Sequence, residues 1–413
     1  MLKEDKVISA ITILGTALAI TMIMVIILTQ RIKTTNIGPE VNRERTMYIP
    51  NVLEVGKKDQ YSNLNQMNIN DYKQYLTMLT TPEKISMIAK GQDDASLEGS
   101  DIYYKADIRN TDAAYWNIYS FSFLAGKPFT NEEFQSGIPV AVISKSLARK
   151  LFNETNEALS KTFVLNKKTY RVIGIVEDVS TLCNYAYAQI WVPYTTNPLY
   201  SQPNIHWFTT VVLAKNKSDF PKIKSEVRRS EIANNPNNDE KEIHFFGPFS
   251  GEELLVKGGS SFDTSEPNIL KGQFRFYLTL FVLLLIPAIN LSGFSLFKII
   301  NRTSEIGIRK AFGAEKKTIL VQVLYENFLT SLIGGFIGLA LSFMVINTIK
   351  DKLFAQEVWE PQLLGENTVP VSTFISPWVF FYVILACIVL NLLSSGIPAW
   401  RASRLRIAEA ILS

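Results

Sequence analysis

Two histidines and two cysteines are the side chains best suited to bind a metal ion or attack a substrate. We find no plausible set of Cys, His or acidic ligands around His206 or His244, so a structural or surface role is expected for both. Cys183 lies in a polar region and Cys387 in an apolar run, so the two are not expected to form a disulfide. This inventory leaves little for a Ser-His-Asp triad, and we expect no metal site.

Acid–base and phosphate chemistry are equally poorly supported. Glu177 and Asp178 form a candidate carboxylate pair, but adjacent residues on a strand point to opposite faces, and a solvated turn is the expected structure. The phosphate-binding pattern G-x-x-x-x-G-K-[ST] does not occur, and residues 258–261 (GGSS) lack its lysine and preceding strand. We therefore expect no catalytic residues in this chain.

The strongest local signal is the basic segment 302–320 (RTSEIGIRKAFGAEKKTIL). Thr303 or Ser304 can cap a helix at its start. The apolar residues Ile308 and Phe312 then fall on one face of that helix, together with Ala311. Such a helix either lies on a bilayer surface or docks into a partner protein, and both interpretations stay open.

The composition excludes several classes of protein. Hydrophobic residues make up 47% and charged residues 19% of the 413 residues, which excludes disorder of the whole chain. A formal net charge of +4 is too small for a nucleic-acid-binding surface, so no nucleic-acid partner is expected. The mean hydropathy of +0.10 is high for a soluble protein, and the excess is concentrated in a few apolar runs.

Four apolar runs reach the roughly 20 residues needed to cross a bilayer. They cover residues 7–28, 276–297, about 328–346 and about 378–397. A long stretch of mixed composition separates the first run from the second and predicts a domain outside the membrane. The predicted fold class is therefore a membrane α protein with a soluble α/β domain, in a 1+3 arrangement of helices.

The charges of the short loops predict the orientation. The segment after the second run and the tail after the fourth run are rich in Lys and Arg. The loop between the third and fourth runs instead carries four acidic residues. The basic segments are expected in the cytoplasm and the large domain outside. The first run could also be a secretory signal peptide, but its length and the lack of an A-x-A site favour an uncleaved anchor.

Periodicity predicts mixed α/β structure in the large domain. The tract 234–239 is expected to be a solvated loop, and the last three predicted elements to form a β-α-β unit. The predicted elements are a helix at 70–79, strands at 85–89 and 140–143, a helix at 145–152, strands at 168–176, 190–193 and 208–214, a helix at 218–232 and a strand at 243–246.

Two membrane runs carry residues suited to packing or bending. Pro287 and Asn290 in the second run predict a kink with a polar contact, or a hinge. Small residues in the third run allow close helix approach, either within the chain or across a dimer. These small residues are Ser331, Gly334, Gly335 and Gly338.

Several motifs together resemble one family. Residues 305–314 (EIGIRKAFGA) are similar to the signature E-I-G-[IL]-R-[KR]-A-x-G-A of FtsX/MacB-type ABC transporter permeases. Residues 398–404 (PAWRASR) and the ending 409–412 (EAIL) look like the closing motif of that family. Residues 125–129, 143–152 and 170–176 resemble its periplasmic domain.

The resemblance implies a non-catalytic permease subunit that sits on a dimer of cytoplasmic ABC ATPases, which bind ATP and Mg. It implies that segment 304–312 is a coupling helix docking into the ATPase. The implied coupling residues are Glu305, Gly307, Ile308, Arg309, Lys310, Phe312, Gly313 and Ala314, and those of the cytoplasmic tail motif are Pro398, Ala399, Arg401 and Ala402.

The resemblance also implies a domain layout. The outside domain would have a membrane-proximal α/β lobe and an inserted β-rich lobe. The expected boundaries are 1–29 for the N-terminus and first helix, 30–272 for the periplasmic domain (lobes at about 45–112 with 206–250, and about 113–205) and 273–413 for the FtsX-like membrane domain.

The implied function is mechanotransmission: ATP hydrolysis on a partner chain moves the outer domain and exports a drug, peptide or lipoprotein. The implied location is a bacterial inner membrane, with a second permease copy or paralogue and an adaptor, outer-membrane channel or lipoprotein as partners. Only six residues precede Val7, where the family usually has an amphipathic elbow helix. The 413 residues contain no counterpart of the ATPase domain that is fused to the permease in macrolide exporters, so a separate ATPase is expected. An FtsX-like scaffold that regulates cell-wall hydrolases is the alternative.

Overall fold

The computed structural model describes residues 6–58, 61–153, 156–202, 205–257, 266–301, 303–354 and 377–404. Within these residues the chain divides into two compact units. The helical unit contains the residues up to Ile32, Leu270–Leu353 and the last described segment, and the α/β unit contains Lys33–Ile269.

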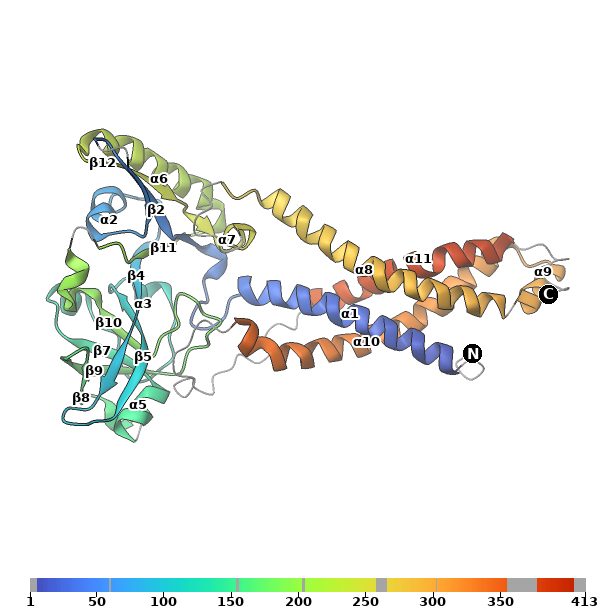
Figure 1. Ribbon diagram of the computed structural model, residues 1–413, viewed down its shortest axis with the longest axis horizontal. Coiled ribbons are helices and arrows are strands. Elements are labelled where there is room, and N and C mark those ends of the chain that lie inside the picture. The colour runs from blue at the N-terminus through green and yellow to red at the C-terminus, as the bar shows by residue number, and fades with distance from the viewer. Residues whose placement is uncertain are drawn as a thin grey trace. The chain divides into compact units, whose positions relative to one another are not determined.

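The helical unit is built from long helices (Figure 1). Three of them contain stretches long and apolar enough to cross a membrane, at Ser9–Thr34, Lys316–Ile349 and Trp378–Gly396. These stretches correspond to the first, third and fourth predicted spans, while the second predicted span lies in α8. The helices are α1 (Lys6–Thr34), α8 (Ile269–Ile300), α9 (Thr303–Ala311), α10 (Lys316–Phe354) and α11 (Pro377–Arg404).

One sheet dominates the α/β unit. Its described strands run in the order β13-β1-β11-β4-β5-β10-β7-β9-β6, with β8 paired to both β4 and β9. The bounds of these ten strands are β1 (Thr46–Ile49), β4 (Lys84–Ser96), β5 (Tyr103–Thr111), β6 (Phe123–Gly126), β7 (Val140–Ser144), β8 (Thr162–Leu165), β9 (Lys168–Val176), β10 (Ile190–Pro193), β11 (Thr209–Leu213) and β13 (Phe249–Ser250).

A second sheet has three described strands in the order β12-β2-β3. Short helices connect and cover the strands of both sheets. The strands are β2 (Asn51–Gly56), β3 (Ser62–Asn65) and β12 (Lys241–Phe246), and the helices are α2 (Ile69–Tyr75), α3 (Tyr115–Ile118), α4 (Asn131–Gln135), α5 (Lys145–Phe152), α6 (Phe220–Asn234) and α7 (Gly251–Lys257).

The predicted β-α-β unit at 208–246 is wrong. Strand β11 pairs with β1 and β4 in the large sheet, whereas β12 pairs antiparallel with β2 in the small one. Both β2 and β12 bury alternate residues, so their apolar faces match when the strands pair. A strand–helix–strand pattern in the sequence does not specify which sheet receives the second strand.

The tract 234–239 after α6 was predicted to be a solvated loop, and it is exposed or half-buried at every position except Asn235. Asn235 is buried, accepts a hydrogen bond from the Tyr75 hydroxyl (2.8 Å) and exchanges two with the backbone of Ile243. The side chain thereby ties the end of α6 to β12, because a buried amide requires such partners.

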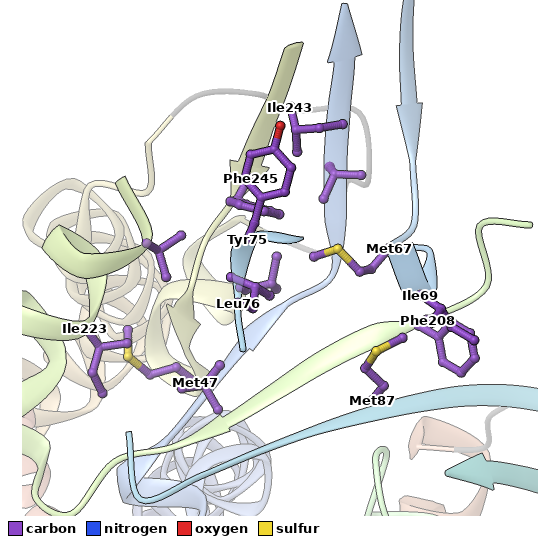
Figure 2. Close-up of a cluster of buried hydrophobic side chains, with 14 of the residues drawn as sticks. Met47, Met67, Ile69, Tyr75, Leu76, Met87, Phe208, Ile223, Ile243 and Phe245 are labelled. Carbon is purple, nitrogen blue, oxygen red and sulfur yellow. The ribbon is translucent and has the colours of Figure 1, made fainter. Parts of the chain in front are cut away.

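The described residues of the α/β unit include two large hydrophobic clusters, here called its first and second cores. The first joins α2, α6 and both sheets, and Figure 2 shows Met47, Met67 and Ile243 within it. Its rings are packed specifically, with Tyr75 edge-on to Phe245 at 5.6 Å between ring centroids. The second core includes β7, β9 and α5, and also Ala95 and Ala106 on the long strands β4 and β5. Strand β4 contributes to both cores, with Met87 and Ala89 in the first and Ala95 in the second, whereas β5 contributes only to the second. Residues on both sides of the expected lobe boundary at 112/113 therefore pack together in the second core.

Helix α5 shows how local signals and distant contacts combine. The Ser144 hydroxyl accepts a hydrogen bond from the Leu147 amide (3.3 Å), which caps the helix. Asp178 accepts bonds from the amide (3.0 Å) and hydroxyl (2.6 Å) of Ser146, and Glu177 pairs with Lys145 at 3.1 Å. The prediction of a solvated turn at 177–178 is therefore wrong, because both carboxylates hold the start of α5.

Candidate functional site: an exposed helix and the contacts that position it

Helix α9 stands between two of the long helices of the helical unit. Its start differs from the expected cap: the Thr303 hydroxyl donates to the carbonyls of Ile299 (3.2 Å) and Ile300 (2.7 Å), at the end of α8. Thr303 and Ser304 both lie inside the helix. The Thr303 hydroxyl thus connects α9 to the preceding helix, whereas a capping hydroxyl would accept a bond from a backbone amide in the first turn of α9.

One apolar side chain of α9 anchors the helix, whereas Ile308 on the helix and Phe312 directly after it are exposed. Ile306 is buried in a cluster with Ile299 of α8 and Ile319 of α10. Ile308 keeps 54% and Phe312 90% of their surface exposed. The same short segment, α9 with Phe312, therefore has a buried inner side and an exposed apolar outer side.

Arg309 belongs to the contacts that position α9. Its guanidinium bonds to the Glu305 carboxylate at 2.5 Å, one turn earlier, and to the Gln322 carbonyl oxygen on α10 at 2.7 Å. Gln322 in turn donates to Glu326 at 3.1 Å. Gln322 is not among the residues predicted from the sequence, because no periodicity relates residues on opposite sides of a turn.

Gly313 makes the turn that leads from α9 to α10. Its φ is +91°, a conformation that favours glycine, and the Ala314 amide donates to the Arg309 carbonyl at 3.0 Å. Gly307 is buried within α9, and the side chain of Lys310 lies outside the described side chains. Of the expected coupling residues, the structure thus brings Ile308 and Phe312 to the outer face and gives Glu305, Arg309 and Gly313 positioning roles.

The small residues of α10 meet two neighbouring helices of the same chain. A Cβ added to Gly334 or Gly338 would lie 2.8 Å from the Ile13 carbonyl or 2.5 Å from the Ala17 carbonyl, both on α1. Gly335 faces Cys387 of α11 in the same way, at 2.5 Å from its Sγ. The structure therefore places these glycines in packing within the chain.

The remaining predicted membrane residues lie in continuous helices. Ser331 is buried, and its carbonyl accepts a bond from the Cys387 thiol at 3.4 Å. Helix α8 continues through Pro287 and Asn290, whose side chains lie outside those described. The tail residues are all in the last turns of α11, with Ala399 buried and Pro398 inside the helix; they are Pro398, Ala399, Arg401 and Ala402.

His206 has two acidic neighbours in space, although none was expected from the sequence. Its ring nitrogen, a Glu54 carboxylate oxygen and an Asp71 carboxylate oxygen lie within 4.8 Å of one another. Lys241 bonds to Glu54 at 2.7 Å and to Asp71 at 3.2 Å, so both carboxylates already have a cation. Burial raises the pKa of Asp71, although Lys241 opposes that change. This cluster links β2, α2 and β12, so its geometry indicates a structural role.

Comparison with known proteins identifies two matching family models. Residues 9–230 match the MacB-like periplasmic core domain, and residues 277–407 match the FtsX-like permease C-terminal domain. The first match alone covers more than half of the chain. Together with the apolar helices, the matches show a membrane protein with an extracellular domain.

Similar proteins include ABC transporter permeases. The permease YknZ of Bacillus subtilis (strain 168) is 24% identical over 348 residues, which cover 82% of each chain. The macrolide export ATP-binding/permease protein MacB of Escherichia coli (strain K12) is 25% identical over 300 residues, covering 72% of this chain and 42% of MacB.

Two solved structures are also similar. The extracellular domain of YknZ from Gram-positive bacteria has a TM-score of 0.36 at 16% identity, covering 49% of this chain and 100% of that one. The periplasmic region of MacB from Actinobacillus actinomycetemcomitans has a TM-score of 0.36 at 16% identity, covering 54% and 94%. On the two family models, the chain belongs to the MacB/FtsX-type ABC transporter permease family.

Proposed function

We propose that this permease works by mechanotransmission, with ATP hydrolysis on a separate cytoplasmic ATPase dimer moving the extracellular domain. In this proposal the chain crosses the membrane four times, with α8 as the second span and α9 in the cytoplasm. ATP and Mg bind to the partner ATPase. A second copy or paralogue completes the permease, and the exported cargo is a drug, peptide or lipoprotein.

The exposed apolar face of α9 is the observation that carries the proposal. Phe312 and Ile308 remain open while Ile306 is held by the flanking helices. Aromatic residues on a fixed element are the usual centres of binding energy at interfaces. Movement of a partner bound to this face would be transmitted to α8 and α10, because Thr303 is hydrogen-bonded to α8 and Arg309 to α10.

The connection from α1 to the α/β unit supports the transmission of movement. Helix α1 continues without a break to Thr34, and the segment that follows is held by buried polar contacts. Glu40 accepts hydrogen bonds from the amides of Tyr185 (2.8 Å) and Ala186 (2.9 Å) and pairs with Arg43 at 2.7 Å. Burial opposes the charge of Arg43, yet Glu40 raises the pKa of its guanidinium overall.

These contacts make the segment after α1 a firm attachment. Arg43 also donates to the Leu182 carbonyl at 2.5 Å, and Tyr48 stacks on Tyr185 with ring centroids 3.9 Å apart. A displacement of α1 would therefore be carried into the sheet, because a buried, fully bonded ion pair is costly to break.

The test is recovery of the ATPase with the tagged full-length permease from its own membrane. Ile308→Ala with Phe312→Ala should lower the amount of co-purified ATPase about tenfold or more, because central apolar residues dominate binding. The matched control is Met78→Ala with Ile232→Ala, which truncates two exposed apolar side chains of the α/β unit.

Equal recovery of the ATPase with the α9 variant and the control, at equal abundance, would contradict docking through α9. It would favour a helix that lies on the bilayer surface. Recovery of a cell-wall hydrolase with the ATPase would favour the FtsX-like scaffold over the exporter.

A further inference from the structure

A groove of about 610 Å³ opens on the helical unit, lined by α1, α8 and α11. Its floor is part of a buried cluster, because Ile23 and Leu284 line the groove and also pack against Leu390. The exposed walls are apolar as well, with Phe281 and Leu385 both open to the surroundings. The groove therefore suits a hydrocarbon chain.

The lining changes character along the groove. The deeper part is aliphatic, with Ile23, Leu284 and Val389. The other end lies at the C-terminal end of α1 and the N-terminal ends of α8 and α11, where polar and amphipathic residues are typical of a membrane–water interface. The residues of this mouth are Gln30, Arg31, Tyr277, Trp378 and Tyr382.

Among the described residues that line the groove, Arg31 is the only charged one. No Asp or Glu occurs in the segments that contribute these helix ends, at 24–39, 267–304 and 367–408. Arg31 lines the groove, and Arg275 is exposed one position before the lining residue Phe276. The occupant should therefore be apolar at one end and anionic at the other.

We propose that the groove binds an anionic phospholipid, with an acyl chain along α1 and α8 and the phosphate at Arg31. A guanidinium binds phosphate oxygens in pairs, and the tyrosine and tryptophan at the mouth suit the headgroup level. The competing occupant of the groove is a second copy of this chain. That copy would place its own Arg31 near this Arg31, and the two positive charges would repel, so charge complementarity favours the anionic lipid. The inference needs only that the bundle lies in a membrane, and it is independent of docking through α9.

The experiment is native mass spectrometry of the full chain in mild detergent, titrated with phosphatidylglycerol or phosphatidylcholine. Phosphatidylglycerol should bind the wild type more tightly than phosphatidylcholine does. Arg31→Gln should weaken phosphatidylglycerol binding about tenfold, the effect of losing one charge-assisted contact. Ala386→Trp, which fills the groove without changing charge, should abolish the tightest binding step.

Arg149→Gln is the matched control, because it removes the same charge from an exposed arginine of α5 that does not line the groove, and it should bind as the wild type does. Equal binding of both lipids, or unchanged binding by Arg31→Gln, would overturn the proposal. So would loss of the dimer in Ala386→Trp with no loss of lipid, which would assign the groove to a second copy. If Ala386→Trp fails to fold, the Arg31→Gln result decides alone.

Discussion

At the scale of single residues, two glycines share a backbone conformation but not their surroundings. Gly126 has a φ of +73° and Gly99 a φ of +76°. A Cβ added to Gly126 would lie 2.1 Å from the Ile173 carbonyl oxygen, whereas one added to Gly99 meets nothing within 4 Å. Replacing Gly99 therefore measures the cost of backbone strain alone, and replacing Gly126 measures the cost of strain together with steric overlap.

We predict that Gly99→Ala lowers the free energy of unfolding by about 1 kcal/mol, from backbone strain alone. Gly126→Ala should cost about 2 kcal/mol more, or prevent folding, since the overlapping atom is backbone and cannot rotate away. Denaturant titration of both variants measures the difference. Equal losses would show that the strand pairing of β6 with β9 adapts to the methyl group.

Asp112 gives a prediction about pH. Its carboxylate is buried and accepts bonds from the Met87 amide (2.9 Å) and the Ser86 hydroxyl (2.8 Å). Burial raises the pKa of Asp112 from 3.8 to about 6, against the opposing effect of these bonds. The folded state therefore holds this proton more tightly than the unfolded state does. The resulting stabilisation is complete below about pH 4 and is lost as the pH rises through about 6.

Asp112→Asn removes this proton-linked contribution. The free energy of unfolding of the wild type, minus that of the variant, should fall between pH 4 and pH 7 by up to about 3 kcal/mol. Thermal or denaturant unfolding across this pH range provides the measurement. A difference that stays flat or rises with pH would show that Asp112 is ionised in the folded protein throughout.

At the scale of elements, the close approach of α10 to α1 depends on glycine. Thr21 of α1 donates to the Gly338 carbonyl at 3.1 Å, and a Cβ at Gly338 would meet α1 backbone. Gly396 of α11 is the natural comparison, because a Cβ there meets nothing within 4 Å.

Gly338→Leu should destabilise the bundle by about 1–3 kcal/mol, the usual range for overpacking, while Gly396→Leu should have little effect. Both cysteines are free and buried, so reaction with a fluorogenic thiol dye during heating reports unfolding. A lower melting temperature is expected for Gly338→Leu alone. The same decrease for both variants would indicate a general effect of bulk on insertion.

At the scale of the whole molecule, the α/β unit has its own two cores and its own sheets. A fragment of residues 33–257 should therefore fold without the membrane helices and unfold cooperatively. A shorter fragment, 46–257, lacks Glu40 and leaves the Tyr185 and Ala186 amides without their acceptor. It should be less stable by about 2 kcal/mol, a typical cost of unsatisfied polar groups.

Circular dichroism and denaturant titration of the two fragments provide the comparison. Equal stability of both would mean that the segment after α1 is a loose tether. That result would also weaken the proposed transmission of movement through α1.

Local patterns determined much of this protein. Local residue patterns, such as the β-branched and aromatic residues of the strand, predicted β9 and α5 with the bounds that the structure has, Lys168–Val176 and Lys145–Phe152. The apolar runs located three helices able to cross a membrane, and the cap-like start and helical spacing at 303–312 predicted the short helix α9 (Thr303–Ala311). These features follow from neighbours within a few residues, so the sequence alone expresses them.

Only the tertiary structure decided which distant residues meet. It brought Gln322 to Arg309, placed Glu54 and Asp71 beside His206, and paired β12 with β2. It also turned the glycines of α10 toward α1 and α11 of the same chain. Each of these pairings depends on the complementary shape and polarity of segments far apart in the chain, and residue spacing contains no record of that complementarity.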